Sequence, residues 1–236
     1  MIGIIGAMET EVKILHSALD RIQKKTIGPF TYYYGSIGNK DIVLLQCGIG
    51  KVQAAAGCAI MLQHFKPSAL INTGSAGGIS QQLYFGDVVI SEGLLYHDVD
   101  VTAFGYLPGQ IPGHPQIFTA DETLQRLVEK AIINLKQEGK LPAQLNYQKG
   151  IIGSGDIFMH EPAKIEQLRK TFPQILAVEM EGAAIAHCCT LFKVPFLVLR
   201  AISDIAGQES PMKFDEFLPL ASRHSSEIVM ELVKNL

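Results

Sequence analysis

The chain has 236 residues, a formal net charge of -3 at pH 7, and 47% hydrophobic against 18% charged residues. This composition is typical of a compact globular protein and excludes a largely disordered chain. Lysines and arginines are scattered, so they form no basic stripe that would bind nucleic acid, and no apolar run approaches the roughly 20 residues that cross a bilayer. Neither nucleic acid nor a membrane is expected as a partner.

Short apolar runs alternate with longer amphipathic stretches, the pattern of helices that cover a central sheet. The predicted strands, in chain order, are residues 2–5, 31–37, 41–47, 69–73, 87–96, 149–154, 175–180 and 195–203. The predicted helices are residues 9–19, 51–65, 121–138, 162–171, 181–192 and 215–233. With no repeat and no linker, the sequence predicts a single α/β domain over residues 1–236, with a central mixed twisted sheet flanked by helices.

One predicted loop is unusual. The segment HDVDVTAFGYLPGQIPGHP, from His97 to Pro115, has no clear periodicity and exposes apolar side chains such as Phe104 and Leu107 among prolines and glycines. Long loops of this kind are usually functional or lie at an interface. Its apolar character favours a surface that contacts a partner.

Cysteine and histidine usage indicates neither a disulfide framework nor a metal site. Cys47, Cys58, Cys188 and Cys189 show no C-x-x-C spacing, and the seven histidines include no pair at ligand spacing. We expect core thiols in a reducing cytoplasm. The first residues, MIGIIGAMETEVK, have no basic residue before the apolar run and predict a buried strand, not a signal peptide.

Polar residues stand at the predicted carboxyl ends of four strands, the edge at which parallel α/β sheets bind ligands. They are Glu11, the segment NTGSAGG at residues 72–78, Glu181, and the pair Ser203 and Asp204. Each has an ordinary structural explanation, because a glutamate in a first helical turn or an aspartate cap needs no function. Together, however, three carboxyl groups that converge on one edge form a site suited to acid and base chemistry.

Six motifs in chain order, GIIGAMETEV, NTGSAGG, YHDVDVTAFGY, SGDIFM, AVEMEGAAIAH and RAISDIA, resemble those of the 5'-methylthioadenosine/S-adenosylhomocysteine nucleosidases of the nucleoside phosphorylase superfamily. The resemblance spans most of the chain. It implies a nucleoside phosphorylase-like fold and hydrolysis of the N-glycosidic bond between adenine and a thio-substituted ribose. It also implies that the reaction uses water and neither a metal nor an organic cofactor.

The resemblance gives a role to three carboxyl groups. Asp204 would protonate adenine at N7, so we expect a water-poor pocket to raise its pKa. Glu11 would be the base that activates water. Glu181 would accept hydrogen bonds from the ribose hydroxyls in its ionised form and stabilise positive charge on the ribosyl ring.

The resemblance also implies further contacts. Within one subunit they are Ser75 and Gly77 near the ribose and water, Phe158 stacked on adenine, Met159 at adenine through its backbone, Met180 at the ribose, Ser203 at the substrate, and Phe214 at the thio substituent. Val101, Phe104 and Pro112 would reach into the neighbour's site, which implies a homodimer. For Glu179, we hypothesise that it supports the site by pairing with Arg200. Two residues depart from the family pattern: Thr10 replaces a common acidic residue, and Met159 replaces a smaller branched one.

Two other readings stay open. A phosphorylase would use phosphate in place of water, but of five arginines only Arg200 adjoins a candidate motif. A non-catalytic nucleoside-binding protein would not need both Glu11 and Asp204. Among hydrolase substrates, 5'-deoxyadenosine and aminodeoxyfutalosine share the adenosine core, and the sequence does not rank them.

Overall fold

The computed structural model describes residues 1–205 and 210–236, except for the side chains of residues 210–212. The strands are β1 (Ile2–Gly6), β2 (Asp20–Ile27), β3 (Phe30–Ile37), β4 (Lys40–Gln46), β5 (Ala69–Gly78), β6 (Val88–Tyr96), β7 (Phe118–Thr119), β8 (Tyr147–Ser154), β9 (Ile175–Glu179) and β10 (Phe196–Ile205). The helices are α1 (Glu9–Ser17), α2 (Lys51–Phe65), the short 3-10 helix η1 (Thr102–Phe104), α3 (Glu122–Gln137), α4 (Pro162–Thr171), α5 (Gly182–Phe192) and α6 (Ser210–Lys234). The predicted α/β class is confirmed.

The strands form one mixed sheet in the order β10-β6-β8-β9-β5-β1-β4-β3-β2, with β7 paired to β6. β10 also pairs with β5 in parallel, so β10, β6, β8, β9 and β5 close into a ring. β1 lies between β4 and β5 and runs parallel to both. The ends of β5, β9 and β10 are thereby brought together, and all three carry motif residues.

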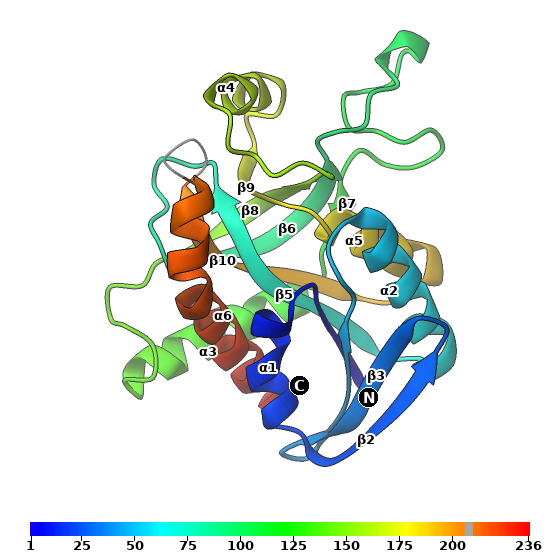
Figure 1. Cartoon of the computed structure of the whole chain (residues 1–236), viewed down its shortest axis with the longest axis vertical. Coiled ribbons are helices and arrows are strands. Elements are labelled where there is room, and N and C mark those ends of the chain that lie inside the picture. Colours follow the sequence, from blue (N-terminus) through cyan, green and yellow to red (C-terminus); the bar gives the residue numbers. More distant parts are fainter. Residues whose placement is uncertain (206–209) are drawn as a thin grey trace.

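The core is built from the apolar runs that predicted the strands. Ile4, Ile5, Leu45, Leu70 and Ile71 of β1, β4 and β5 are fully buried, and each such side chain contributes about 1.5–3 kcal/mol of hydrophobic stabilisation. Helices α1 and α3 pack against α6 on one side, and α2 packs against α5 on the other (Figure 1). Among the residues that the structure describes, no helix is both long and apolar enough to span a membrane.

All predicted strands and helices are present, but β2 and the two-residue strand β7 were not predicted. The sequence of β2, DRIQKKTI, has no buried face, because its residues are exposed or half-buried along its whole length. It forms a hairpin with β3 through a turn at Gly28, whose φ of 59° suits glycine. Tertiary pairing, not an apolar pattern, therefore determines this edge strand.

The strand predicted at residues 69–73 was too short. β5 continues to Gly78, because Gly77 and Gly78 pair with β9 on one side and with β10 on the other. β10 likewise runs to Ile205, so Asp204, which was predicted to follow the strand of residues 195–203, lies within it.

The predicted long apolar loop joins β6 to β7 and extends away from the body of the protein, as the green segment of Figure 1 shows. It contains η1. The Phe104 side chain is 81% exposed and Leu107 is 55% exposed. Because exposed side chains of this size gain nothing from the chain's own core, the loop is a candidate contact surface.

Candidate active site

A cavity of about 460 Å³ lies at the ends of β5, β9 and β10, beside the starts of α1 and α5. The residues predicted from the sequence that line it are Glu11, Ser75, Gly77, Phe158, Glu179, Met180, Glu181, Ser203, Asp204 and Phe214. Met159 is buried and lines a small hollow next to it, together with Phe158 and Asp204. The structure thus brings segments from six parts of the chain to one place.

Three predicted residues lie elsewhere. Val101, Phe104 and Pro112 are on the loop that extends from the body, and they do not line this cavity. Conversely, Met8 and Ile49 line the cavity and were not predicted. Both side chains are apolar, so a search for polar residues at strand ends did not single them out.

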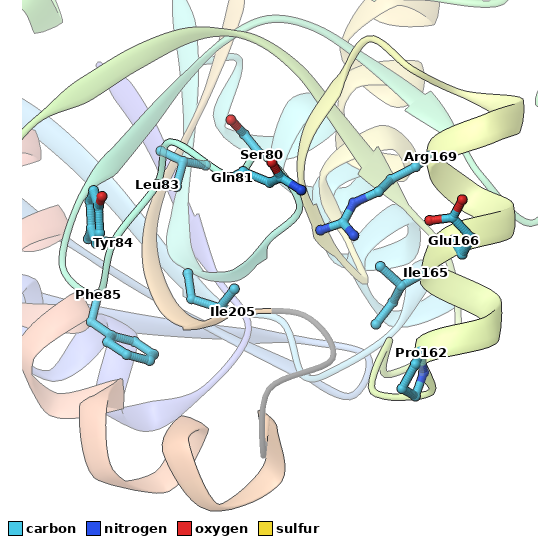
Figure 2. Close-up of a pocket in the computed structure, with 10 residues that line it drawn as sticks. All are labelled: Ser80, Gln81, Leu83, Tyr84, Phe85, Pro162, Ile165, Glu166, Arg169 and Ile205. Carbon is cyan, nitrogen blue, oxygen red and sulfur yellow. The ribbon is translucent and has the colours of Figure 1, made fainter.

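A larger hollow of about 650 Å³ lies between the β5–β6 connection and α4 (Figure 2). Its charged groups already have partners: Arg169 donates a 2.9 Å hydrogen bond to the carbonyl oxygen of Ile79, and Glu166 lies 3.4 Å from Lys170 Nζ. No strand-end carboxyl group lines it. Although the first cavity is smaller, it is therefore the candidate active site, because the carboxyl groups at the strand ends line it.

Glu11, in the first turn of α1, is fixed by four hydrogen bonds. Its Oε2 accepts from the backbone N–H groups of Ala7 and Met8, both at 3.0 Å. Its Oε1 accepts from the backbone N–H and the hydroxyl of Ser75, both at 2.9 Å. The carboxylate is thereby clamped between the end of β1 and the middle of β5, so its position is set before any ligand binds.

A glycine makes room for this carboxylate. A Cβ atom at Gly74 would lie 2.6 Å from Glu11 Oε1, closer than real Cβ contacts allow. Gly77 plays the same part for Asp204, since a Cβ there would lie 3.1 Å from Asp204 Oδ2. The glycines of NTGSAGG therefore let two carboxyl groups approach the β5 backbone.

A β-bulge places Asp204. The pairing of β10 with β5 shifts between Ile202 and Asp204, so Ser203 is an extra residue in the strand. Such a bulge re-aims the following side chain, and here it directs Asp204 to the cavity, opposite Gly77. The Asp204 side chain is buried, and Ser203 Oγ lies 3.0 Å from Asp204 Oδ1.

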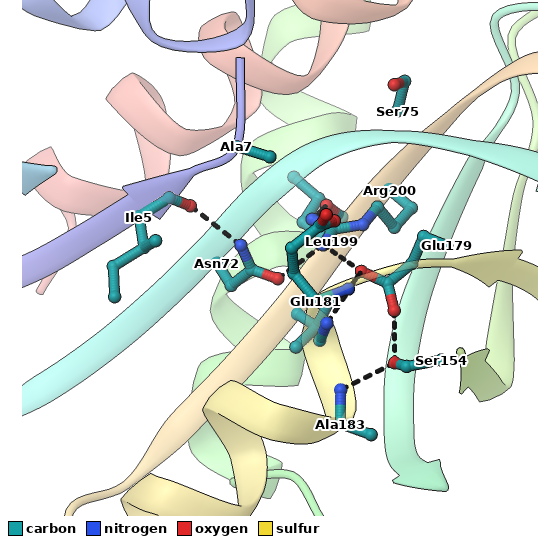
Figure 3. Close-up of polar contacts among 12 residues, drawn as sticks. Ile5, Ala7, Asn72, Ser75, Ser154, Glu179, Glu181, Ala183, Leu199 and Arg200 are labelled. Carbon is teal, nitrogen blue, oxygen red and sulfur yellow. Dashed lines mark hydrogen bonds and ion pairs between the residues drawn. The ribbon is translucent and has the colours of Figure 1, made fainter. Parts of the chain in front are cut away.

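Glu179 and Arg200 form a buried ion pair at the floor of the cavity (Figure 3). Arg200 Nη2 lies 2.5 Å from Glu179 Oε2 and donates a 2.6 Å hydrogen bond to Asn72 Oδ1. Although burial opposes ionisation, the Arg200 guanidinium holds the pKa of Glu179 below its usual range. Arg200 is thus occupied by protein groups and does not face the cavity.

The other contacts of Glu179 fix the start of α5. Its Oε2 accepts from the backbone N–H groups of Glu181 at 3.0 Å and Gly182 at 2.7 Å. Ser154 Oγ donates to Glu179 Oε1 and accepts from the N–H of Ala183 at 2.7 Å. Ser154 belongs to the SGDIFM motif, but its role was not predicted, because only the fold shows that β8 ends beside α5.

Glu181 lies against the first residues of α2. Its Oε1 accepts a 2.8 Å hydrogen bond from the backbone N–H of Gly50. Burial, reinforced by the neighbouring Glu179 carboxylate, raises the pKa of Glu181 to about 8. The sequence predicted an ionised Glu181, whereas this environment favours the protonated carboxyl near neutral pH in the absence of a ligand.

The apolar side of the cavity comes from Phe158 and Phe214. Their ring centroids lie 5.9 Å apart in an edge-to-face arrangement, and Phe158 remains 40% exposed. A planar ring can therefore stack on Phe158. Among the described residues, no lysine or arginine lines the cavity, and no group of three or more His, Cys, Asp and Glu is arranged to hold a metal ion.

The fold and the cavity define the class of the protein. Residues 1–234 match the family model of the Phosphorylase superfamily. This match covers every residue that lines the cavity.

Individual relatives define the class more narrowly. The chain is 47% identical over 235 residues to the 5'-methylthioadenosine/S-adenosylhomocysteine nucleosidase of Lysinibacillus sphaericus (strain C3-41), covering 100% of this chain and 99% of that one. A nucleosidase of the same name from Colwellia psychrerythraea 34H, solved in complex with adenine, has a TM-score of 0.95 and 42% identity, with 100% and 95% of the two chains covered. The futalosine hydrolase of Helicobacter pylori strain 26695 has a TM-score of 0.91 and 32% identity, with 100% and 99% covered. The chain belongs to the family of 5'-methylthioadenosine/S-adenosylhomocysteine nucleosidases.

We predict that Gly74→Ala lowers kcat/KM for adenine release from 5'-methylthioadenosine by about 10- to 100-fold, because the new methyl group displaces the Glu11 carboxylate. Circular dichroism should show a folded protein. The matched control is Gly74→Ala in a Glu11→Gln background. There it should lower kcat/KM little further, because both changes act on the carboxyl group of Glu11. Equal losses in the two backgrounds would contradict this explanation.

We also predict that Glu181→Gln raises the melting temperature, and that the gain grows between about pH 5 and about pH 8.5. The pKa of Glu181 rises from its ordinary 4.5 to about 8 on folding, so the folded wild type retains a proton that the unfolded chain releases, and its stability falls across this window. Glutamine does not titrate. In a chain of this size 1 kcal/mol corresponds to roughly 2–4 °C, so the gain should reach several degrees.

The control for this experiment is Glu9→Gln, a change of an exposed glutamate in α1. Its effect on the melting temperature should be small and should not grow over the same pH range. A gain from Glu181→Gln that does not change with pH would refute the raised pKa.

Proposed function

We propose that this protein hydrolyses the N-glycosidic bond of 5'-methylthioadenosine and S-adenosylhomocysteine, releasing adenine and the thio-substituted ribose. The observation that carries the proposal is that Glu11 and Asp204 line one cavity, each fixed by a different part of the fold. The identity of 47% with a nucleosidase of that name over the whole chain supports the same reaction. Cavities of this volume hold ligands of nucleoside size.

In the proposed mechanism Asp204 donates a proton to adenine N7 and Glu11 takes a proton from the attacking water. The leaving adenine becomes neutral as the bond to the ribosyl carbon breaks, and the water oxygen forms the new bond to that carbon. Each positioned acid or base typically contributes about 10²- to 10⁴-fold in rate. The bulge that directs Asp204 and the clamp on Glu11 support this division of roles.

Glu181 is proposed to bind the ribose hydroxyls. Hydrogen bonds from those hydroxyls favour the ionised carboxylate, so substrate binding would lower the pKa of Glu181 from about 8. The ionised form then stabilises the positive charge that develops on the ribosyl ring. Ser75, Gly77, Met180 and Ser203 complete this polar side, and Phe158, Met159 and Phe214 form the apolar side for adenine and the 5' group.

Water is favoured over phosphate as the nucleophile. A phosphate dianion needs cationic donors, and arginine is the residue best suited to supply them. Arg200 is buried and bonded to Glu179 and Asn72, and no lysine or arginine of the described residues lines the cavity. Phosphate would therefore be placed among carboxyl groups without compensation.

A second candidate substrate is aminodeoxyfutalosine. It is favoured by the likeness to the futalosine hydrolase of Helicobacter pylori, with a TM-score of 0.91. That substrate shares the adenosine core, so Glu11, Asp204 and Glu181 would act on it in the same way. 5'-Deoxyadenosine also contains the adenosine core, so it is assayed as a substrate alongside aminodeoxyfutalosine.

We further propose that the protein acts in the cytoplasm as a homodimer in which Val101, Phe104 and Pro112 cover the neighbour's site. The loop that carries them extends from the body (Figure 1), and its most exposed apolar side chain, Phe104, is 81% exposed. A partner surface that buries the Phe104 ring would contribute about 1.5–3 kcal/mol.

We predict that the wild type releases adenine in phosphate-free buffer, and that Glu11→Gln and Asp204→Asn each lower kcat by about 10²-fold or more. Asp204→Asn should bind substrate with only a modest loss of affinity, because an amide keeps the shape of the carboxyl group. Adenine release is followed by absorbance, and binding by calorimetry. Adenine release at the wild-type rate from either variant would remove that residue from the mechanism.

For the dimer, we predict that Phe104→Ala lowers kcat/KM by about tenfold or more and that mixing it with the inactive Glu11→Gln variant restores activity. In a mixed dimer, the intact Glu11 of the first protein and the intact Phe104 of the second meet in one site. Activity that equals the average of the separate variants, after exchange of subunits is shown by mass spectrometry, would contradict the shared site.

A further inference from the structure

Three charged side chains outside the cavity form a compact cluster: Lys51 at the start of α2, Asp98 after β6, and Asp156 after β8. Lys51 Nζ lies 2.8 and 2.6 Å from the two carboxylate oxygens of Asp98, and 3.7 Å from Asp156 Oδ2. Asp98 Oδ2 also accepts a 2.9 Å hydrogen bond from the backbone N–H of Asp156. None of the three lines the cavity, and the proposed chemistry uses none of them.

Asp156 connects this cluster to the active site through the first turn of α2. Its Oδ1 accepts a 2.9 Å hydrogen bond from the backbone N–H of Lys51, one of the N–H groups that a helix start leaves without an internal partner. The preceding residue, Gly50, donates its own N–H to Glu181 Oε1 at 2.8 Å. Asp156 and Glu181 therefore hold neighbouring amide groups of the same short segment.

The segment of residues 48–51 contains two glycines in left-handed backbone conformations, and the Gly50 carbonyl oxygen accepts a 3.1 Å hydrogen bond from the N–H of Ala54. Gly48 and Gly50 have φ angles of 87° and 97°, and glycine enters and leaves such conformations easily. Gly48 is anchored by a 3.0 Å hydrogen bond from its N–H to the carbonyl oxygen of Ala7. At the other end of the segment, Asp156 is the side chain that accepts a hydrogen bond from the N–H of Lys51, the residue after Gly50.

We propose that Asp156 is a positioning residue for ribose recognition: by holding the N–H of Lys51, it fixes the Gly50 N–H to which Glu181 is bonded, and so sets the direction of the Glu181 carboxyl group. Asp98 and Lys51 fix Asp156 in turn, through the hydrogen bond from the Asp156 N–H to Asp98 and the ion pair of Asp156 with Lys51. Asp98 is only 13% exposed, so its ion pair with Lys51 is less screened than one on the open surface. This inference rests on the proposed function, because it assigns Glu181 to the ribose hydroxyls.

The test compares Asp156→Ala with Asp156→Asn and with a matched control, Asp121→Ala. Asp121 caps α3 by accepting a 2.9 Å hydrogen bond from the N–H of Leu124, so its loss removes a similar helix-start contact far from the cavity. Each protein is assayed for kcat and KM with 5'-methylthioadenosine and with its 2',3'-dideoxy analogue, which lacks both ribose hydroxyls and has a weaker glycosidic bond. Melting temperatures are measured in parallel.

Asp156→Ala should lower kcat/KM for 5'-methylthioadenosine by about tenfold or more, but for the dideoxy analogue by less than about threefold. Asp156→Asn, whose amide oxygen still accepts from Lys51, should recover most of the loss. Asp121→Ala should leave both values within about twofold of wild type, although it also lowers the melting temperature.

Equal losses on the two substrates, or an Asp156→Ala variant that behaves like Asp121→Ala, would overturn the inference and leave Asp156 an ordinary helix cap. A wild type that releases no adenine from 5'-methylthioadenosine would instead overturn the proposed function. The two failures are therefore distinguished within one experiment.

Discussion

The buried ion pair between Glu179 and Arg200 is the constraint on which the rest of the site depends. It joins β9 to β10, reaches β5 through Asn72, and anchors the first amide groups of α5. Removal of one partner from such a pair typically costs about 3–5 kcal/mol, because the other charge is left buried without compensation. The pair therefore keeps β5, β9 and β10 in one arrangement, and the groups that line the cavity are placed relative to it.

The environment of each carboxyl group follows from this arrangement. Glu179 faces a guanidinium and three donors, so it stays charged and structural. Glu181 lies two residues later. Its burial, together with the negative charge of Glu179, raises its pKa to about 8. The two glutamates on either side of Met180 thus differ in charge: Glu179 is ionised and supports the fold, whereas burial and the charge of Glu179 favour the protonated form of Glu181 near neutral pH.

The sequence predicted the central strands and helices because their apolar runs are long and buried, as in β1 and β5. It missed β2, whose polar residues are ordered only by pairing with β3, and it ended the β5 strand at residue 73, before the glycines that pair with β9 and β10. Candidate side chains such as Glu11 and Asp204 were predicted from their places at strand ends. Backbone donors such as the N–H of Gly50 carry no side-chain signal, and the raised pKa of Glu181 depends on distances that only the folded chain has.

Direct attack of water on the ribosyl carbon is the step that separates a hydrolase from a phosphorylase. Its most direct test is mass spectrometry of the sugar product from 5'-methylthioadenosine cleaved in ¹⁸O-labelled water with phosphate present. The account predicts one ¹⁸O atom at C1 of a free thio-substituted ribose, incorporated at the moment of cleavage and measured before ring opening exchanges it. A sugar 1-phosphate without the label would contradict the account and identify the protein as a phosphorylase.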